Sequence, residues 1–399
     1  MHRIKITIAL LLLTNSLPCQ KLQTVEVAKA YNDRGQINLS SFTQSIEYIQ
    51  LETSEETLLR YPKVKGIQGD SIILVKSSRR ISIFDRKTGD FLYDIGHSGN
   101  DPNSYLLPGP LSFNPINGNI FAMRHMFEFV EYSSVTKKIV NKIPTPDFID
   151  DDKIAVVDPQ GQKHVRSIST FHWMSEGYMA GYVQNYGGKE KLKLIIYDEN
   201  GEIVKYFNNQ RSFTKDKQQS IKGYIVDFHD YNKQSFFKEW FSDTLYSFSS
   251  QKMTPLFYFN TEKYRPIYEK QDLISDEQRR NLMFTKIITQ DINNLYFQVY
   301  YKDMYRIGLF NKKTNKTLIA DRKKDELLGF YNDIDNFVPF APKFTTPEGN
   351  LVGIITSEEM LSWFDLNKTK ASKLPSHLLK FKDIDPEDNP ILMVVKPKK

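Results

Sequence analysis

The sequence has little of what covalent catalysis needs. Its 399 residues include one cysteine, Cys19, so the chain beyond it has no internal disulfide and no nucleophilic cysteine. It has no Gly-x-Ser-x-Gly elbow, no glycine-rich phosphate loop, no Gly-x-Gly-x-x-Gly and no His-Glu-x-x-His. A cysteine-based zinc site is excluded too. We therefore expect no cofactor, no metal site and no assignable catalytic residue.

The sequence also lacks a large excess of charge of one sign, and it lacks long apolar runs. The net charge is +6, and Lys and Arg alternate with Asp and Glu through most of the chain. Nucleic-acid-binding proteins usually carry a basic stripe instead, so we expect no nucleic-acid partner. After the N-terminus no segment approaches the roughly 18 apolar residues of a membrane-spanning helix. Contact with a membrane is therefore expected only through an N-terminal lipid.

The first 19 residues have the layout of a secretory signal peptide. His2, Arg3 and Lys5 form a basic start, residues 6–13 are almost wholly apolar, and residues 14–16 are polar. Residues 1–19 are therefore predicted to be an export leader.

Cys19 at the end of this leader allows two interpretations. A cysteine there is typical of a bacterial lipoprotein, in which it carries the lipid anchor, whereas Leu17 and Pro18 are a poor match to the small residues that usually precede it. Lipid anchoring at Cys19 is slightly favoured over a cleaved protein without an anchor. Either way we expect an exported protein, in the periplasm or associated with the outer membrane.

One pattern recurs along the chain: a short strand that ends in an aromatic residue, a polar turn, and a second strand. Alternating apolar and polar positions around Gly-, Asn- or Lys-rich turns are typical of β-hairpins. The six copies lie at residues 81–95, 129–143, 194–207, 245–259, 307–320 and 361–374. Their aromatic residues are Phe84, Tyr132, Tyr197, Phe248, Phe310 and Phe364.

Another strand-like run precedes most copies, so that each unit has three or four strands. Six such units predict an all-β, six-bladed β-propeller over residues 46–399, since ring closure buries sheet faces that one unit cannot bury alone. Strands at 46–51 and 391–395 are predicted to complete one blade together. Residues 270–286 are predicted to contain a short helical insertion, and residues 20–45 are predicted to be a linker.

Four stretches resemble a known family. The sequence YIQLET at residues 48–53, the strand–glycine–strand hairpin at 83–92, the turn at 95–105 and the strand that starts with Asn389-Pro390 occur in the order found in exported six-bladed β-propellers of Bacteroidetes, which look like NHL-repeat propellers. In the turn, Asp101 and Ser104 stand where that family has Gly and Glu. The resemblance implies the fold and export; the family has no well-defined shared activity, so it implies no site residues.

Histidines and acidic residues are the first candidates for chemistry. His125, His164, His172 and His229 fall in different units, and a propeller can gather ligands from several blades around its channel. Scattered, hydrogen-bonded histidines are the favoured interpretation over a metal or lyase-type site. Asp147, Asp150, Asp151 and Asp152 do not have the spacing of a calcium loop, so a solvated acidic loop is favoured there.

Aromatic side chains are the candidates for ligand binding, since they bury area at low entropic cost. Tyr186, in the loop Asn185-Tyr186-Gly187-Gly188, is the weak candidate for a ligand-binding residue because loops carry function more often than strands. The other members of the set are Trp173, Trp240, Trp363, Tyr182 and Tyr301, and for Trp363 packing in the core is favoured.

These observations lead to a hypothesis of a non-enzymatic binding or scaffold propeller in the cell envelope, with an unknown glycan, peptide or envelope protein as its partner at one channel mouth. The alternative is an envelope hydrolase or lyase with a site at the central channel. A structural subunit of a larger complex is a third possibility.

Overall fold

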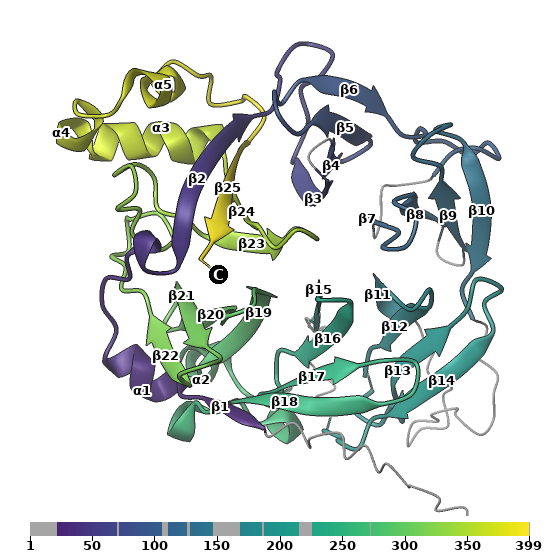
Figure 1. The fold of residues 1–399 in the computed structure, drawn as a ribbon. Helices are drawn as coiled ribbons and strands as arrows, with labels where there is room; N and C mark the ends of the chain where they lie inside the picture. The colour runs from purple at the N-terminus through teal and green to yellow at the C-terminus, as the bar shows by residue number, and fades with distance from the viewer. Residues whose placement is uncertain are drawn as a thin grey trace, which may run out of the picture.

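The computed structural model describes residues 22–69, 72–105, 111–125, 128–146, 168–185, 187–214, 226–271 and 273–398. Six sheets, antiparallel except for one added parallel strand, stand around a central axis, which we call the channel (Figure 1). Each sheet has one strand nearest this axis and its last strand at the rim. The predicted six-bladed β-propeller is therefore confirmed. Among the described residues no helix has the length and apolarity needed to cross a membrane.

The first three blades are meanders that run outward from the channel. Blade 1 contains β3 (Lys63–Gln68), β4 (Ile72–Lys76), β5 (Ile81–Asp85) and β6 (Phe91–Asp94). Blade 2 contains β7 (Leu111–Phe113), β8 (Ile120–His125), β9 (Glu128–Tyr132) and β10 (Ile139–Pro144). Blade 3 contains β11 (Ile168–Trp173), β12 (Met179–Val183), β13 (Leu192–Tyr197) and β14 (Ile203–Asn208).

The last three blades keep this order and add strands from the N-terminus. Blade 4 contains β15 (Val226–Tyr231), β16 (Gln234–Glu239), β17 (Thr244–Phe248), β18 (Met253–Phe259) and β1 (Gln23–Val25). Blade 5 contains β19 (Phe284–Gln290), β20 (Asn294–Tyr301), β21 (Met304–Asn311) and β22 (Lys316–Ile319). Blade 6 contains β23 (Pro342–Thr345), β24 (Leu351–Ile355), β25 (Ile391–Pro397) and β2 (Thr43–Gln50).

The core lies between the blades. Six clusters of buried apolar side chains each join two neighbouring blades. Phe121 of blade 2 stacks on Trp173 of blade 3 with ring centroids 4.5 Å apart, and Phe257 of blade 4 meets Phe310 of blade 5 edge-on at 5.8 Å. Since both faces of a blade are covered, a middle strand such as β13 is buried at every position.

The ring is closed in blade 6 by the two ends of the chain. The N-terminal β2 pairs antiparallel with the C-terminal β25, from Thr43 opposite Pro397 to Gln50 opposite Ile391. The prediction that strands at 46–51 and 391–395 complete one blade is thus confirmed. The closure removes the unpaired edge that each of these strands would otherwise expose.

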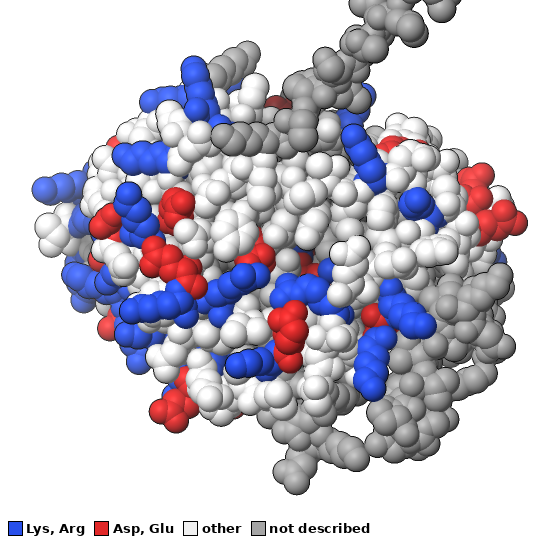
Figure 2. Space-filling view, turned by 90° about the horizontal axis from the view of Figure 1, so that it is seen from below, with Lys and Arg blue, Asp and Glu red and all other residues white. Residues whose placement is uncertain are grey.

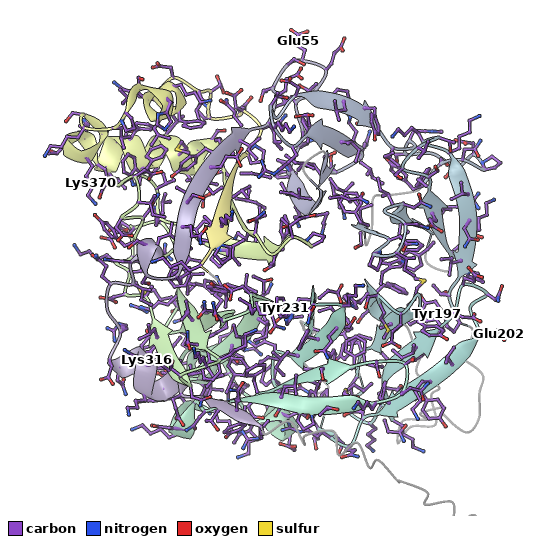
Figure 3. All side chains as sticks on the ribbon, in the orientation of Figure 1. Glu55, Tyr197, Glu202, Tyr231, Lys316 and Lys370 are labelled. Atoms are coloured by element: carbon purple, nitrogen blue, oxygen red, sulfur yellow. The ribbon has the colours of Figure 1, made fainter. Side chains whose placement is uncertain are left out.

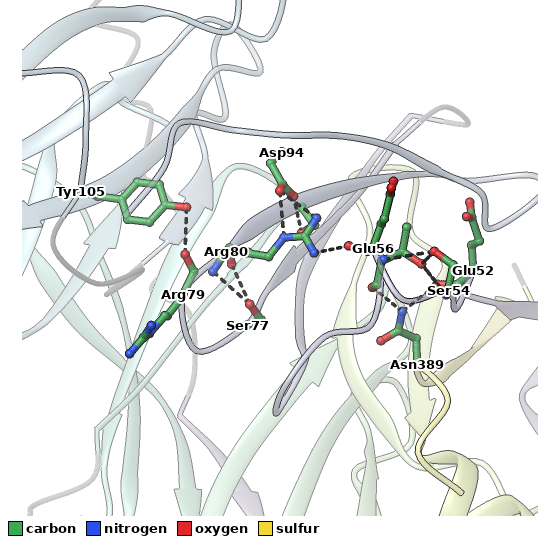
Figure 4. A network of polar contacts seen from close by, with 11 residues as sticks. Glu52, Ser54, Glu56, Ser77, Arg79, Arg80, Asp94, Tyr105 and Asn389 are labelled. Atoms are coloured by element: carbon green, nitrogen blue, oxygen red, sulfur yellow. Dashed lines mark hydrogen bonds and ion pairs between the residues drawn. The ribbon is translucent and has the colours of Figure 1, made fainter. Parts of the chain in front are cut away.

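Asn389 reinforces the closure just before β25. Its side-chain amide donates to the carbonyl oxygens of Glu52 (2.7 Å) and Thr57 (2.9 Å), and its Oδ1 accepts from the backbone N–H of Leu59 (3.0 Å). The residue is 1% exposed, so this one side chain satisfies three backbone groups of the loop that leads into blade 1. Figure 4 shows the Asn389 contacts beside those of Arg80 and Asp94.

The described part of the segment predicted as a linker, from residue 22 on, is folded onto the propeller. β1 pairs parallel with β18, with Gln23 opposite Phe257. Helix α1 (Val27–Asn32) buries Val27, Ala28, Ala30 and Tyr31, and the 3-10 helix η1 (Leu39–Ser41) leads into β2. The apolar positions of this short, polar-looking segment are enough to pack it along blades 4, 5 and 6.

The sixth predicted hairpin, at 361–374, is wrong. This region forms α3 (Ser357–Leu366) and α4 (Lys368–Ala371), and α5 (Ser376–Leu379) and η4 (Lys380–Lys382) follow. Thr356 and Glu359 form a capping box, and Met360, Trp363 and Phe364 follow at helical spacing and are buried. Helical periodicity therefore outweighs the apparent aromatic–turn pattern. The helices lie outside blade 6 (Figure 1).

The helical insertion predicted at 270–286 is confirmed and is short. It is α2 (Asp276–Arg280), capped by Ser275 and Gln278, and two 3-10 helices precede it, η2 (Glu262–Tyr264) and η3 (Tyr268–Lys270). The other five predicted hairpins correspond to the last two meander strands of blades 1 to 5.

Candidate functional site

The two mouths of the channel differ because the innermost strands share one direction. β3, β7, β11, β15, β19 and β23 surround the channel, and each begins an identical outward meander. Contacts between neighbouring innermost strands are consistent with this shared direction. In the first half of β19 and near the start of β15, the N–H of Ile287 donates to Asp227 Oδ2 (3.2 Å). At the ends of β23 and β19, Thr345 Oγ1 donates to the carbonyl of Gln290 (3.0 Å). The first residues of all six strands therefore meet at one mouth and the last residues at the other.

The mouth at which the innermost strands begin carries four lysines from three blades. They are Lys63 and Lys65 of β3, Lys286 of β19 and Lys343 of β23, each within the first three residues of its strand. All four are exposed. We call this set the lysine mouth. Lys63 and Lys65 precede Lys286 and Lys343 by more than 200 residues, so only ring closure brings the two groups to one opening.

Backbone irregularities lie beside two of these lysines. The β3–β4 ladder shifts register between Val64 and Gly66, which brackets Lys65, and the β23–β24 ladder shifts between Pro342 and Phe344, which brackets Lys343. A β-bulge re-aims the side chain of its extra residue and is common next to functional sites. Both bulged lysines lie on strands that line the channel.

Like charges are concentrated in blade 1. Lys63 lies opposite Lys76 in the β3–β4 ladder, and Lys65 follows at the register shift between Val64 and Gly66. The pKa of Lys65 is lowered by partial burial and then by repulsion from Lys63, and the pKa of Lys76 is lowered by partial burial and by both neighbours. In the folded protein these ammonium groups are therefore held closer together than their charges favour.

In the part of the chain that the structure describes, one buried carboxylate faces the lysine mouth, beside Lys286. Asp227 of β15 is 9% exposed, and its Oδ1 lies 3.7 Å from Lys286 Nζ. Burial raises the pKa of Asp227 to about 6, against the opposing effect of Lys286 and Lys238. Burial also lowers the pKa of Lys238 to about 8, and its ammonium donates to the carbonyls of Thr285 (2.8 Å) and Glu239 (3.2 Å). Among the described residues no carboxylate forms such a pair with Lys63 or Lys65.

A buried ion pair supports the same end of blades 3 and 4. Lys193 Nζ lies 2.6 Å from Glu239 Oε2, and Tyr182 donates to Glu239 Oε1 (3.0 Å). Asn185, next to Tyr186, donates to the hydroxyl of Tyr268 (3.1 Å). Tyr182, Asn185, Glu239 and Tyr268 border a cavity of about 10 Å³ together with Trp240, Phe241 and Gln271. This volume suits one water molecule and no larger ligand.

At the opposite mouth His172, Asp230 and Ser235 form a network that resembles a hydrolase triad in composition. Asp230 Oδ1 (3.0 Å) and Ser235 Oγ (3.1 Å) both contact the same ring nitrogen of His172, Nε2. A catalytic triad needs the carboxylate on one ring nitrogen and the hydroxyl on the other, so that the ring can transfer a proton between them. Ser235 is also 3% exposed. The network therefore lacks triad geometry.

His229 lies on the neighbouring strand and bonds elsewhere. Its Nε2 lies 3.0 Å from Gln290 Nε2, so it accepts from the amide, and its ring stacks on Phe236 at 4.8 Å. Burial lowers the pKa of His229 to about 3, which keeps the ring neutral near pH 7. Tyr231 lies at the channel edge nearby, whereas Glu202, Lys316 and Lys370 lie at the outer rim (Figure 3).

His229→Gln should change how stability depends on acid. Between pH 6.5 and pH 3 the unfolded chain binds a proton that the folded chain does not, so the free energy of unfolding falls as the pH falls through this window. We expect the native protein to lose about 2 kcal/mol more than the variant between pH 7 and pH 5. Urea unfolding at both pH values measures this, with the exposed His377→Gln as control; equal losses in native protein and variant would contradict it.

The structure brings together few of the residues that the sequence singled out. His172 and His229 are on adjacent innermost strands; among the described residues no group of three or more His, Cys, Asp or Glu can hold a metal ion. Trp173, Trp363, Tyr182 and Tyr301 are buried in the core, and Trp240 packs edge-on against Phe284. Cys19, His164, Tyr186 and the Asp147–Asp152 cluster lie outside the described residues, as does the side chain of His125.

Two further surfaces, a groove at the rim and the side of the ring, carry charges of both signs. A groove of about 690 Å³ lies at the rim between α1 and the outer edge of β22, bordered by Glu26, Lys29, Asp33 and Lys316 among others. Its charges are mixed. Figure 2 shows the side of the ring from below, where Lys and Arg are interspersed with Asp and Glu. The lysine mouth, with four cations on the innermost strands, differs from both.

Comparison with known proteins supports the fold and the family. Residues 22–396 match DUF4934, a domain of unknown function. The chain belongs to the DUF4934 family. A candidate exported protein from Bacteroides fragilis NCTC 9343 is similar in structure, with a TM-score of 0.64 and 15% identity over 95% of this chain and 100% of the other. A DUF4221 member from Bacteroides vulgatus ATCC 8482 has a TM-score of 0.52 and 11% identity over 89% and 97%.

At these sequence identities the two similarities show a shared fold and nothing more. No curated protein matches this DUF4934 chain in sequence. The resemblance to six-bladed propellers of Bacteroidetes is supported by these findings, and the likeness to NHL repeats stays a prediction. Sequence analysis missed the lysine mouth; its one local signal is the alternation Lys63-Val64-Lys65 at the start of a strand.

Proposed function

We propose that this DUF4934 protein is an exported binding protein of the cell envelope that holds an anionic ligand at the lysine mouth. The observation that carries the proposal is the convergence of Lys63, Lys65, Lys286 and Lys343 at one opening, with one buried carboxylate, Asp227, beside them. Export is supported by the leader at residues 1–19 and by the name of the Bacteroides fragilis protein of similar fold. A lipid at Cys19 stays a prediction.

The physical basis is electrostatic. Holding several ammonium groups together costs free energy. The pKa of Lys65 is lowered first by partial burial and then by repulsion from Lys63, so repulsion contributes to this shift. An anion placed among them removes the repulsion and gains charge-assisted hydrogen bonds, so the folded protein is already arranged for such a ligand. The alternative of a hydrolase or lyase at the channel is not favoured by the His172 network, because its hydroxyl and carboxylate share one ring nitrogen.

Binding of citrate and pyrophosphate, measured by calorimetry at low and high salt, tests the proposal. We expect both anions to bind and Lys63→Gln/Lys65→Gln to weaken binding about tenfold or more, because two charge-assisted contacts are lost. The matched control is Lys205→Gln/Lys316→Gln, which removes the same charge from exposed positions on outer strands β14 and β22. Equal loss in both double variants, or no binding by the native protein, would refute the proposal.

A further inference from the structure

The lysine mouth continues outward in blade 1 as a basic corner, which we define as Arg60, Tyr61, Lys63, Lys65 and Arg79. Residues 60–62 lead directly into β3, and Arg79 lies in the turn between β4 and β5. The backbone N–H of Ser78 donates to the carbonyl oxygen of Arg60 (3.2 Å), which fastens the two loops together. Arg60, Tyr61, Lys63, Lys65 and Arg79 are all exposed. The corner therefore presents two cations on β3 together with two further cations and one aromatic ring on the adjoining loops.

The side chain of Tyr61 is exposed to solvent and does not pack in the core. Its side chain is 74% exposed, and its backbone has φ 54°, a left-handed conformation that is costly for a bulky residue. The guanidinium of Arg60 lies 5.6 Å from its ring centroid. No packing in the described core accounts for a tyrosine at this position. Strain that persists without a packing benefit is typical of positions that serve binding.

Two acidic side chains near the basic corner, Asp94 and Glu52, are engaged by other groups of blade 1. Asp94 bonds Arg80 (2.8 Å) and the hydroxyl of Ser82 (2.7 Å), and Glu52 accepts from the backbone N–H of Phe91 (2.8 Å). Glu55 lies at the outer edge of the ring in Figure 3, away from the channel. The charge of Lys63, Lys65 and Arg79 is thus left for a ligand; no ion pair of these three occurs among the described residues.

We propose that the ligand of the lysine mouth is an acidic glycan, with a sugar ring stacked on Tyr61 and carboxylate or sulfate groups at Lys63, Lys65 and Arg79. This inference rests on the proposed function and names its ligand class. A flat aromatic side chain suits the apolar face of a sugar, and clustered cations suit its repeated acidic groups. A single-stranded nucleic acid would need several aromatic rings along a track, and the basic corner has one. An acidic peptide offers no repeated flat face for Tyr61.

The test measures binding of five fluorescent probes at two salt concentrations: a heparin oligosaccharide, an oligogalacturonate, neutral maltohexaose, oligo-dT and polyglutamate. We expect the two acidic glycans to bind best and maltohexaose not to bind. Tyr61→Gly should weaken glycan binding about five- to tenfold, in line with loss of one stacked contact. Lys63→Gln/Lys65→Gln should weaken it further and reduce the salt dependence.

Controls separate binding from folding. Tyr61→Gly removes the ring at a left-handed position that suits glycine, so it should leave thermal stability unchanged or raised. Tyr61→Phe keeps the stacking face and should retain affinity. Tyr206→Ala removes a tyrosine that is 51% exposed on the outer strand β14 and should have no effect on glycan binding.

The outcomes distinguish the two proposals. If polyglutamate or oligo-dT binds as tightly as the acidic glycans and Tyr61→Gly has no effect, the glycan inference is overturned while the anion site at the lysine mouth stands. If glycans bind but neither blade 1 variant weakens them, the placement at the basic corner is overturned. If no anionic probe binds, the proposed function fails as well.

Discussion

Lys193→Met is expected to lower the free energy of unfolding by about 3–5 kcal/mol, because it leaves the buried carboxylate of Glu239 without its cation. Lys193 and Glu239 are 2.6 Å apart, with side chains 10% and 7% exposed. Tyr182 cannot take the place of the lost ammonium, because its hydroxyl already donates to Glu239 Oε1. Urea unfolding at pH 7–8 measures the loss.

The choice of pH follows from linkage. Glu239 opposes the effect of burial and leaves the pKa of Lys193 raised above its ordinary value. The stabilisation from this raised pKa is fully present below the pKa of the unfolded chain and is lost as the pH rises through the folded value. At pH 7–8 the whole contribution is therefore measured.

Two variants make the Lys193 result specific. Lys193→Met/Glu239→Gln removes both charges but keeps an amide oxygen for Tyr182, and we expect it to recover about half of the loss or more. Lys191→Met changes an exposed lysine two residues earlier and should alter stability by less than about 0.5 kcal/mol. A loss below about 1 kcal/mol for Lys193→Met would show that the pair is hydrated and contributes as a surface ion pair does.

Asn389→Ala is expected to destabilise the protein by about 3 kcal/mol, since it leaves buried backbone groups of Glu52, Thr57 and Leu59 without their partner. The effect should act on ring closure, because these bonds join the start of β25 to the loop before blade 1. Guanidinium unfolding measures the loss, and limited proteolysis after residue 52 should become faster. The exposed turn residue Asn200→Ala is the control; a similar small change in both variants would contradict a role of Asn389 in closure.

The strands of the blades could be predicted because their signals are local. The hairpin at 81–95 alternates apolar and polar residues around Gly89, and Ile81, Ile83 and Phe84 are buried in the structure. The same local reasoning failed at 361–374, where aromatic residues near a polar stretch imitate a hairpin. There the capping box of Thr356 and Glu359 and the burial of Met360, Trp363 and Phe364 favour a helix.

The segment before β2 was predicted as a linker and is folded, for a different reason. Residues 23–25 add a strand to blade 4, although their nearest partner, β18, lies more than 200 residues away in sequence. A three-residue strand has no periodicity to recognise, and it is stable only because β18 offers an unpaired edge. The linker interpretation reflected polar composition, and composition does not reveal an edge elsewhere in the chain.

The candidate site was hidden from sequence analysis for a related reason. The sequence predicted aromatic residues and histidines as candidates for the site. Trp173 and Trp363 are instead buried in the core, and His172 and His229 bond to neighbouring polar side chains. Lysines are mostly exposed in any folded protein, and nothing local marks Lys286 or Lys343. Their position within the first three residues of an innermost strand has meaning only after the strands are arranged in a ring.

Alternating polarity and turn residues determined by themselves that this chain builds blades 1 to 5, since these signals act over a few residues. The sixth hairpin was predicted at 361–374, which is helical, and blade 6 was predicted through its strands at 46–51 and 391–395. Tertiary structure alone decided which end of the channel is basic and which side chain of blade 1 is displayed. Electrostatic repulsion among Lys63, Lys65 and Lys76 depends on cross-strand distances, and the convergence with Lys286 and Lys343 depends on the common direction of the innermost strands. The first depends on the β3–β4 ladder, and the second exists only once β2 and β25 pair and close the ring.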